Sequence, residues 1–445
     1  MISKPEEPNK TDEVIFRPIE NTQPVFYIIG FALICVLLAS GYFYYTQFRY
    51  GLGVTGLNRP VYWGFYIVNF VFFIGISHAG TLISAILRLC NAEWRRPITR
   101  MAEVITVVVL CIGGIHPIID LGRPDRMLNL FKYGRLQSPL LWDVISVTTY
   151  LTASSIYLFL PLIPDIAILR DRGTRPHWLY EFLAWGWQGT ERQKKVLHRA
   201  MNILMVMVIP IAVSVHTIIA YIFAMTLRTG WHSTIFGPYF VVGAIFSGIA
   251  SIFMVMIIFR KVFHFEGYLK LVHFQNLSKL LLVMAIIWLY FTFSEMLTGY
   301  FAGEPHEFEI LRSKLIGEQA VWFWMMFTGN FILPVIILSN PRLRTISGIF
   351  IVSCGIIVGM WIERYLIVIP TLSHSIFAQG IYYPALVEIM LFVGAVAAFM
   401  LGYLIFAKFF PLIAIWEIRE GREEAVEMVS ERVKSYQPDG EEVFL

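Results

Sequence analysis

Several titratable side chains stand inside long apolar runs of this sequence, where a charge costs about 2.5–3.5 kcal/mol on insertion scales. His78, His116 and His216 lie within such runs. Asp120 follows His116 by four residues, a spacing that places both side chains on one face of a helix. Asp143 stands near the start of the next run. An imidazole beside a carboxylate accepts protons near neutral pH, so these residues indicate acid–base chemistry.

A second set of charged residues lies in the same runs or in neighbouring ones. We predict that these residues contribute to a proton path: Glu103, Lys279, Glu295, Glu363, Arg364 and Glu388. Arg123 follows the third run, and we predict a positional or electrostatic role for it at the mouth of a pocket. Structural alternatives stay open for several of these side chains. Asp143 could cap its helix or complement the helix dipole, Asp120 and Arg123 could form ion pairs at the membrane interface, and the histidines and the Glu363–Arg364 pair could be purely structural.

The elements that carry these residues are predicted to be transmembrane helices. The chain has 445 residues, of which 57% are hydrophobic and 15% charged, against about 25% charged in soluble domains. A span needs about 20 mostly apolar residues, and in lipid it must be helical to pair its backbone groups. Ten runs qualify: 24–46, 60–89, 101–120, 140–163, 200–226, 236–259, 271–301, 318–339, 345–369 and 382–412. We therefore predict an all-α integral membrane protein with about ten transmembrane helices.

The polar segments between the runs give the organisation of the chain. An N-terminal segment (1–23) precedes helices 1–4 (24–163), an amphipathic linker (164–199) follows, and helices 5–10 (200–412) lead to a tail (413–445). Most of the 35 lysines and arginines fall on the side of the membrane that carries the N-terminus. The positive-inside rule therefore predicts that both termini, the linker and the tail are cytoplasmic.

In this orientation, most of the ionisable residues within the runs fall in the outer half of the bilayer. We therefore expect a polar pocket that opens towards the outer face, and not an evenly lined pore. The four cysteines stand singly and form no CxxC motif, so we expect no metal or iron–sulfur cluster bound by this chain.

Oxidation of a quinol fits these residues, because it releases two electrons and two protons. Such a site needs an apolar slot for the ring, hydrogen-bond partners for two oxygens and a base that passes protons to water. We predict His78, Asp120 and Asp143 as the catalytic proton acceptors. The chain carries no recognisable redox centre, so the electrons must pass to a partner.

Two other classes of function stay open. A haem bound by His78 and His216 is one, although paired histidines do not recur along the chain as they do in cytochrome-b-like proteins. A proton-coupled carrier is the other, because carriers also use buried carboxylates and broken helices. The sparse inner half argues against a path that alternates between the two faces.

Several motifs together resemble those of the NrfD/polysulfide-reductase-like membrane subunits, most closely the quinol-oxidising ActC subunits of bacterial alternative complex III. The similarity extends over nearly the whole chain. It rests on GISHAGTLISA (75–85), LGRP (121–124), SPLLWDV (138–144), LIPDIAILRDR (162–172), SVHT (214–217), GWHSTIFGPYF (230–240), GMWIERY (359–365) and FFPLIAIWEI (409–418).

The resemblance implies two four-helix bundles, helices 2–5 and 6–9, with helices 1 and 10 at their flanks. It also implies a menaquinol or quinone site in the first bundle near the periplasmic face, without haem or iron–sulfur in this chain. The residues implied for quinol binding are His78, His116, Asp120, Arg123 and His216.

The same resemblance implies a multi-subunit oxidoreductase in the bacterial inner membrane, inactive as an isolated chain. The implied partners are an iron–sulfur/molybdopterin-like subunit, haem c subunits, a second NrfD-like membrane subunit and lipid, with no nucleic acid. Proton translocation is left open. Reduction of quinone in a polysulfide-reductase-like complex stays open too, because one site serves both directions of electron flow.

Overall fold

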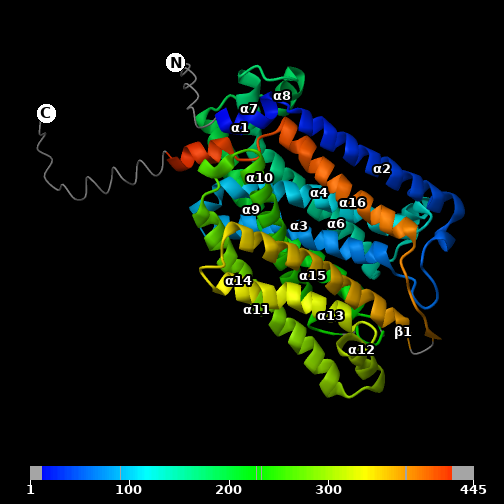
Figure 1. The fold of residues 1–445 in the computed structure, drawn as a ribbon. Coiled ribbons are helices and arrows are strands. Elements are labelled where there is room, and N and C mark those ends of the chain that lie inside the picture. Colours follow the sequence, from blue (N-terminus) through cyan, green and yellow to red (C-terminus); the bar gives the residue numbers. More distant parts are fainter. Residues whose placement is uncertain (1–12, 91, 227, 232, 376–377, 423–445) are drawn as a thin grey trace, which may run out of the picture.

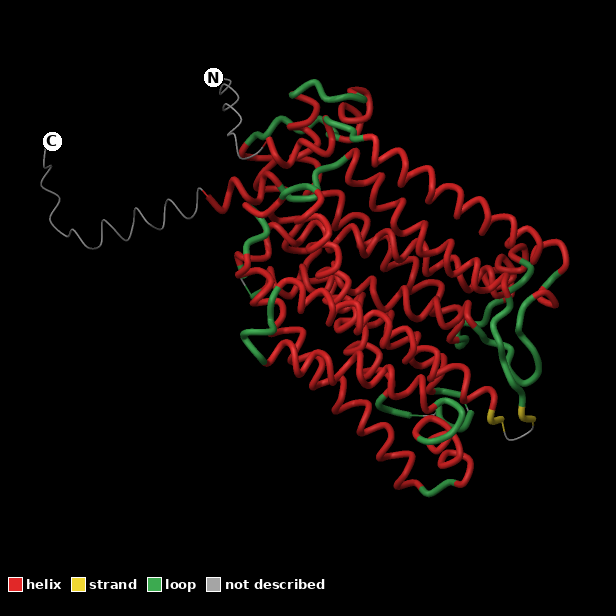
Figure 2. The backbone as a smooth tube through the Cα atoms, viewed as in Figure 1, coloured by secondary structure: helices red, strands yellow, loops and turns green. Residues whose placement is uncertain are grey.

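A computed structural model of the chain shows an almost entirely helical fold (Figure 2). The described residues are 13–90, 92–226, 228–231, 233–375 and 378–422. The two strands among them, β1 (His374–Ser375) and β2 (Ala378–Gln379), form one short antiparallel pair. The ends of the predicted N-terminal segment and C-terminal tail lie outside the described residues, as does His232 of the GWHSTIFGPYF motif.

Ten helical segments among the described residues are long and apolar enough to cross a bilayer, which confirms the predicted number. They are α2 (Pro24–Tyr50), α3 (Phe65–Leu89), α4 (Arg96–Asp120), α6 with α7 (Pro139–Phe159, Ile163–Asp171), α9 (Glu191–Ala224), α10 (Phe236–Val262), α11 (Leu271–Ala302), α13 with α14 (Ala320–Phe327, Leu333–Ser339), α15 (Ile346–Ser373) and α16 (Leu386–Phe409).

Shorter helices connect or flank these spans. They are α1 (Glu13–Glu20), α5 (Met127–Tyr133), α8 (His177–Leu183), α12 (Pro305–Leu315), the 3₁₀ turns η1 (Leu52–Val54), η2 (Glu93–Arg95), η3 (Pro124–Arg126), η4 (Leu160–Leu162) and η5 (Phe265–Gly267), and the π-helical η6 (Thr328–Ile332) between α13 and α14.

The spans form the two expected bundles. Helices α3, α4, α6 and α9 pack around one another, and α10, α11, α13–α14 and α15 make the second bundle. Helix α10 packs against α3 and α9, so the two bundles share an extensive contact. The first and last spans, α2 and α16, pair with each other beside the first bundle, where α16 contacts α4. Figure 1 shows this pair along one side of the molecule.

The two ends of the molecule are named here by the elements they carry. The terminal end holds α1, α7, α8 and the helical residues 415–422, so the described parts nearest both chain termini lie together (Figure 1). The far end holds α12 and the β1–β2 pair (Figure 1). An even number of crossings requires this arrangement, which agrees with termini on one side of the membrane.

Local sequence explains where several helices begin. Thr190 and Gln193 form a capping box at α9, and the Thr345 side chain caps α15. The long helix α9 therefore starts within the predicted linker 164–199, and α7 reaches into the same segment from the other side. Between α7 and α9, Trp178 on α8 and Trp185 just after α8 have exposed side chains. Tryptophan is common where a protein meets the membrane surface.

Candidate functional site

Small residues around His78 allow the helices of the first bundle to approach closely. A side chain at Gly80 would collide with the backbone of Ala102 on α4. A side chain at Gly248 on α10 would stand 2.7 Å from Ala79. Helix α3 is therefore enclosed by its neighbours, and His78 lies in the middle of it with no exposed surface. The small residues of the motif thus have the packing role that their size predicts.

His78 and His216 form a buried pair between α3 and α9. Their ring centroids are 4.0 Å apart and neither side chain is exposed. His78 Nε2 lies 2.7 Å from the Ala212 carbonyl oxygen and Nδ1 lies 3.1 Å from that of Ile74. A neutral imidazole has one N–H, so it donates to one of these carbonyls at a time. Both nitrogens of His216 lack a hydrogen-bond partner among the described residues.

Tyr150 on α6 completes the surroundings of this pair. Its ring centroid lies 5.1 Å from that of His78, and its hydroxyl donates to the Ser77 carbonyl oxygen at 3.1 Å. The Thr106 hydroxyl on α4 donates to the same oxygen at 2.6 Å. Two neighbouring helices, α4 and α6, therefore hold the backbone of α3 beside His78 in a fixed position.

His116 and Asp120 lie towards the far end of α4 and face α3 and α16. The His116 ring packs against Phe73, and its Nδ1 donates to the Ile112 carbonyl oxygen at 2.9 Å. The Asp120 carboxylate interacts electrostatically with Glu388 on α16, and its Oδ1 has no hydrogen-bond partner among the described residues. The shared helix face agrees with the four-residue spacing.

Asp143 stands on a different helix and in a different group. It is buried on the first turns of α6, and its Oδ1 also lacks a partner in the described part of the chain. Among the described residues, no hydrogen bond or electrostatic interaction joins it to Asp120. The structure therefore keeps the two predicted carboxylate acceptors apart.

Arg123 lies on the surface of the far end. Its guanidinium forms an ion pair with Asp125 at 3.0 Å, and both side chains are more than half exposed. The hydrogen bonds from Arg123 lower the pKa of the Asp125 carboxyl. Arg123 and Asp125 lie in the segment between α4 and α5. Their contact is an exposed ion pair, the alternative to a role for Arg123 at the mouth of a pocket.

The Glu388 carboxylate accepts three hydrogen bonds. It accepts from the Gly56 amide at 2.7 Å, from the Ala385 amide at 2.9 Å and from the Tyr382 hydroxyl. The same Tyr382 hydroxyl lies 3.0 Å from the Phe65 amide. This carboxylate joins the start of α16 to the segment between α2 and α3.

Glu363 and Arg364 connect the second bundle to the buried histidines. Arg364 Nη1 lies 3.4 Å from Glu363 Oε1, and its guanidinium stacks 4.5 Å from the Phe240 ring centroid. The Trp288 indole donates to Glu363 Oε2 at 2.9 Å. Arg364 also interacts electrostatically with His216, although the two lie on different bundles. Glu363 and Arg364 therefore pair with each other, although neighbouring residues on a helix point in different directions and need not do so.

Glu363 lines a cavity of about 540 Å³ that opens beside α12. The cavity also contains Glu295, which accepts a hydrogen bond of 2.6 Å from the Ser233 hydroxyl. Lys314 of α12 reaches the same space. Burial lowers the pKa of Lys314, and the nearby Glu295 opposes that shift. Three residues of the predicted proton path, Glu295, Glu363 and Arg364, therefore lie in one region.

The other three predicted path residues lie elsewhere. Glu388 belongs to the α2–α16 side, and Glu103 lies near the terminal end of α4, where it accepts from the Ser84 hydroxyl at 3.1 Å. Lys279 is exposed on α11. The structure therefore does not bring the six residues together into one chain of contacts.

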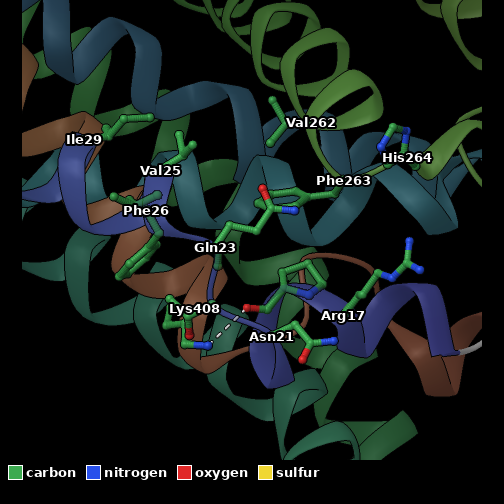
Figure 3. Close-up of a pocket in the computed structure, with 14 residues that line it drawn as sticks. Arg17, Asn21, Gln23, Val25, Phe26, Ile29, Val262, Phe263, His264 and Lys408 are labelled. Carbon is green, nitrogen blue, oxygen red and sulfur yellow. Dashed lines mark hydrogen bonds between the residues drawn. The ribbon is translucent and has the colours of Figure 1, made fainter.

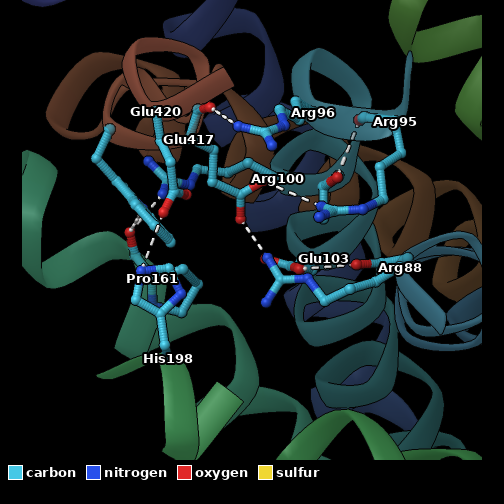
Figure 4. Close-up of polar contacts among 12 residues, drawn as sticks. Arg88, Arg95, Arg96, Arg100, Glu103, Pro161, His198, Glu417 and Glu420 are labelled. Carbon is cyan, nitrogen blue, oxygen red and sulfur yellow. Dashed lines mark hydrogen bonds and ion pairs between the residues drawn. The ribbon is translucent and has the colours of Figure 1, made fainter. Parts of the chain in front are cut away.

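Glu103 borders a buried ionic network at the terminal end that sequence reasoning missed (Figure 4). Glu417 accepts from Arg88 at 2.5 Å and from Arg95 at 3.1 Å. Arg100 pairs with the fully buried Asp165. The arginines lie at or beside the ends of predicted spans, where charged side chains are usually exposed to solvent. No pattern in the sequence relates them to Glu417, which is more than 300 residues away, so the sequence did not predict the network.

The geometry argues against haem between His78 and His216. A porphyrin would have to separate the two rings, which are in direct contact at 4.0 Å between centroids. The described residues contain no group of three or more histidine, cysteine or acidic side chains placed to hold a metal ion. Cys35, Cys90, Cys111 and Cys354 form no disulfide with one another.

Comparison with known proteins agrees with this architecture. Residues 53–375 match the family described as polysulphide reductase, NrfD. A putative dimethyl sulfoxide reductase membrane subunit of Halobacterium salinarum is 27% identical over 71% of this chain and 70% of its own length. A selenate reductase subunit of Mesobacillus selenatarsenatis is 25% identical over 73% of this chain and 78% of its own.

A third relative covers more of the chain. The Hdr-like menaquinol oxidoreductase integral membrane subunit of Archaeoglobus fulgidus is 22% identical over 92% of this chain and 100% of its own length. The family match spans both bundles, including His78, Asp120, Asp143, His216 and Glu363. The chain belongs to the NrfD polysulphide reductase family of membrane subunits.

Proposed function

We propose that the chain is the quinol-oxidising membrane subunit of a multi-subunit oxidoreductase, with its site in the far half of the first bundle. Relatives named as membrane subunits of dimethyl sulfoxide and selenate reductases and of a menaquinol oxidoreductase support a subunit role in such a complex. The last of these matches the chain over nearly its full length and favours menaquinol as the substrate.

The observation that carries the proposal is a set of buried acid–base atoms without partners. His216 Nδ1 and Nε2, Asp120 Oδ1 and Asp143 Oδ1 all lie in the far half of the helices that bound the first bundle, and none makes a hydrogen bond with the described residues. Buried polar atoms are nearly always paired, so unpaired ones indicate a missing ligand or water. A quinol presents two hydroxyl groups that could pair with such atoms.

The roles of individual residues follow from which atoms are free. His216 offers unpaired nitrogens to a quinol hydroxyl, whereas both His78 nitrogens face backbone carbonyls. A proton that reaches His78 makes both of its nitrogens donors, and each then has a carbonyl to pair with. We therefore propose His216 as the first contact and His78 as the proton acceptor behind it, with Asp120 and Asp143 as further acceptors.

The quinol loses two protons to these side chains and two electrons to a partner, because no redox group is proposed in this chain. None of the four cavities described for this structure contains His78, Asp120 or Asp143. Entry of the quinol ring therefore requires packed side chains of the first bundle to move. Arg123 is proposed to guide the substrate or the partner from the surface.

The far end offers a surface for an electron-accepting iron–sulfur protein. The segment after Arg123 exposes large apolar side chains that include Leu128, Phe131, Tyr133 and Leu136, each more than half exposed. Apolar surface of this kind, beside charged residues, is typical of protein interfaces. Haem c subunits and a second NrfD-like membrane subunit are proposed as further members of an alternative-complex-III-type assembly.

The orientation that fits this assembly places the terminal end in the cytoplasm of a bacterium and the far end in the periplasm. Basic residues are concentrated at the terminal end, as the positive-inside rule requires. The partner would then receive electrons on the outer face, and protons released at the far end would contribute to a transmembrane gradient.

Activity of the assembled complex tests the proposal. We expect His78→Ala and His216→Ala to lower quinol:acceptor turnover by about 10²-fold or more, the usual contribution of a positioned acid–base group. Near-normal turnover in both variants would remove the histidine pair from the mechanism. The proteins that co-purify in mild detergent, together with their visible spectrum, test the proposed partners.

Two competing functions predict different results. Reduction of quinone, as in reductase complexes, predicts that a reduced partner drives quinone consumption faster than quinol drives acceptor reduction. A carrier that acts alone predicts solute uptake by the purified chain in liposomes without any redox partner. A carrier needs one site that is reached from both faces of the membrane. The six residues predicted for a proton path lie in separate regions, which disfavours a carrier function.

A further inference from the structure

At the terminal end, a hollow of about 500 Å³ lies between the start of α2, the end of α10 and the end of α16 (Figure 3). It is separate from the histidine pair and from the ionic network of Figure 4. Helix α1 closes one side of it, because Ile15, Phe16 and Ile19 of that helix are buried against the bundle. The hollow thus lies where an interfacial helix meets the first transmembrane helix.

Polar and apolar side chains are segregated within this hollow. Figure 3 shows Arg17, Asn21 and Lys408 on one side and Val25, Ile29 and Val262 on the other. The polar side belongs mainly to the segment before Pro24, at which α2 begins. The apolar side belongs to the transmembrane helices themselves. The boundary therefore coincides with the start of the first transmembrane helix.

The polar side is positively charged. Arg17 and Lys408 line it, and no aspartate or glutamate is among the described lining residues. The Arg17 side chain is exposed and makes no ion pair or hydrogen bond with the described residues. Lys408 Nζ donates to the carbonyl oxygens of Pro18 and Ile19 at 3.4 and 2.6 Å, which directs its charge into the hollow.

We propose that this hollow binds one phospholipid with an anionic headgroup. Arg17 and Lys408 pair with the phosphate, Asn21 and Gln23 contribute amide groups beside it, and an acyl chain follows Phe26, Ile29 and Leu404 along the helices. Basic hollows at the positively charged side of a membrane protein are where acidic lipid headgroups bind. The bound lipid joins α1 and α2 to α10 and α16.

Lipid binding to the detergent-purified complex, stripped of endogenous phospholipid, tests this site. Phosphatidylglycerol and phosphatidylcholine with identical acyl chains are titrated, and bound lipid is counted by native mass spectrometry. We expect phosphatidylglycerol to bind more tightly. Each positive charge near a membrane surface accounts for about a fivefold change in affinity, so Arg17→Gln should weaken binding about fivefold and the double variant Arg17→Gln/Lys408→Gln about 30-fold.

Matched variants separate the site from general charge and from folding. Arg192→Gln/Lys195→Gln removes two exposed positive charges from the same end of the molecule, outside the hollow, and should leave binding unchanged. Leu404→Trp fills the apolar side without changing charge and should also weaken binding. Arg17→Gln keeps the contacts of Lys408 with α1, so its effect is not a consequence of lost structure.

Three results would overturn the proposal. Equal binding of both lipids, or equal weakening by the Arg192/Lys195 control, would mean that no specific anionic-lipid site exists. Competition by glycerol phosphate with no effect of Leu404→Trp would mean a site for free anions. Unchanged phosphatidylglycerol binding in the double variant would mean that Arg17 and Lys408 do not hold the headgroup.

Discussion

The rings of His78 and His216 are in contact at 4.0 Å between centroids, yet within the described residues only His216 has free nitrogens. His78 is enclosed by backbone carbonyls from its own helix and from α9. Under the proposed function, this difference assigns the hydrogen bond to the quinol to His216 and the acceptance of the proton to His78. From the sequence we predict His78 among the catalytic residues and His216 only among the quinol-binding residues, because a sequence does not show which ring nitrogens are occupied.

The first prediction concerns the order of these two histidines. We expect His216→Phe to raise the apparent Kd for quinol and to lower turnover, because it removes the free ring nitrogens of the pair. His78→Gln should lower turnover by about 10²-fold or more while it changes quinol affinity less, because the lost group accepts a proton and does not touch the ring. Steady-state kinetics and quinol titration of the assembled complex measure both quantities.

A matched control is His273→Gln, which alters a mostly buried histidine near the terminal end of α11, distant from the pair in sequence and in fold. It should leave both quantities unchanged. If His78→Gln weakens binding as much as His216→Phe does, the division of tasks is incorrect.

The second prediction concerns the buried ionic network. Asp165 pairs with Arg100 and also accepts from the backbone amides of Ile415 and Trp416 at 3.2 and 3.0 Å. Asp165→Asn leaves the buried arginine charge unpaired, which costs about 3–5 kcal/mol. We expect a lower midpoint of thermal unfolding in detergent, together with faster protease cleavage near Trp416.

The comparison variant is Glu191→Gln, which breaks an exposed pair with Lys194 and should cost at most about 1 kcal/mol. Equal effects of Asp165→Asn and Glu191→Gln on the unfolding midpoint would show that burial adds nothing to the Arg100–Asp165 pair.

These two regions differ in how far sequence could predict them. The number of spans and the shared face of His116 and Asp120 follow from local composition and helix periodicity, which act over a few residues, whereas the division into two bundles came only from the family resemblance. The Arg88–Glu417 pair joins residues 329 positions apart, and only the packed fold brings them together. The free nitrogens of His216 likewise depend on where neighbouring carbonyls point. Sequence indicated which side chains are costly in a membrane, but not which of them are satisfied there.

The third prediction concerns Lys314, whose pKa is lowered by burial from its ordinary value of 10.5. Between the lowered pKa and 10.5 the unfolded chain keeps this proton and the folded chain has lost it. The unfolded state then binds more protons, so stability rises with pH in this window. We expect Lys314→Met to flatten that rise when thermal unfolding in detergent is followed as the pH approaches 10.5 from below.

The control for this measurement is Lys195→Met, because Lys195 is exposed and lines none of the four described cavities. Lys195→Met should show the same dependence of stability on pH as the wild-type protein. A steeper slope in Lys314→Met than in the wild type would reverse the sign that burial requires.

The last prediction concerns Glu363, which stands between the charge of Arg364 and the cavity beside α12. We expect protons from the histidine region to leave through this carboxyl group, because Arg364 interacts with His216 and Glu363 opens towards Glu295. Glu363→Gln should then slow turnover by about 10²-fold, and proton release at the far end should lag behind acceptor reduction. A pH-sensitive dye outside oriented vesicles follows that release.

Glu363→Gln also removes a partner of the buried Arg364, so lost activity alone does not distinguish a proton carrier from a structural anchor. Trp288→Phe removes the indole donor to Glu363 but keeps the carboxyl group, and it should retain proton release. Glu388→Gln alters a carboxylate that already accepts three hydrogen bonds on the α16 side, and it should affect thermal unfolding more than proton release. If all three variants lose stability and retain one synchronous proton release per electron, Glu363 acts as architecture and protons leave the first bundle by another route.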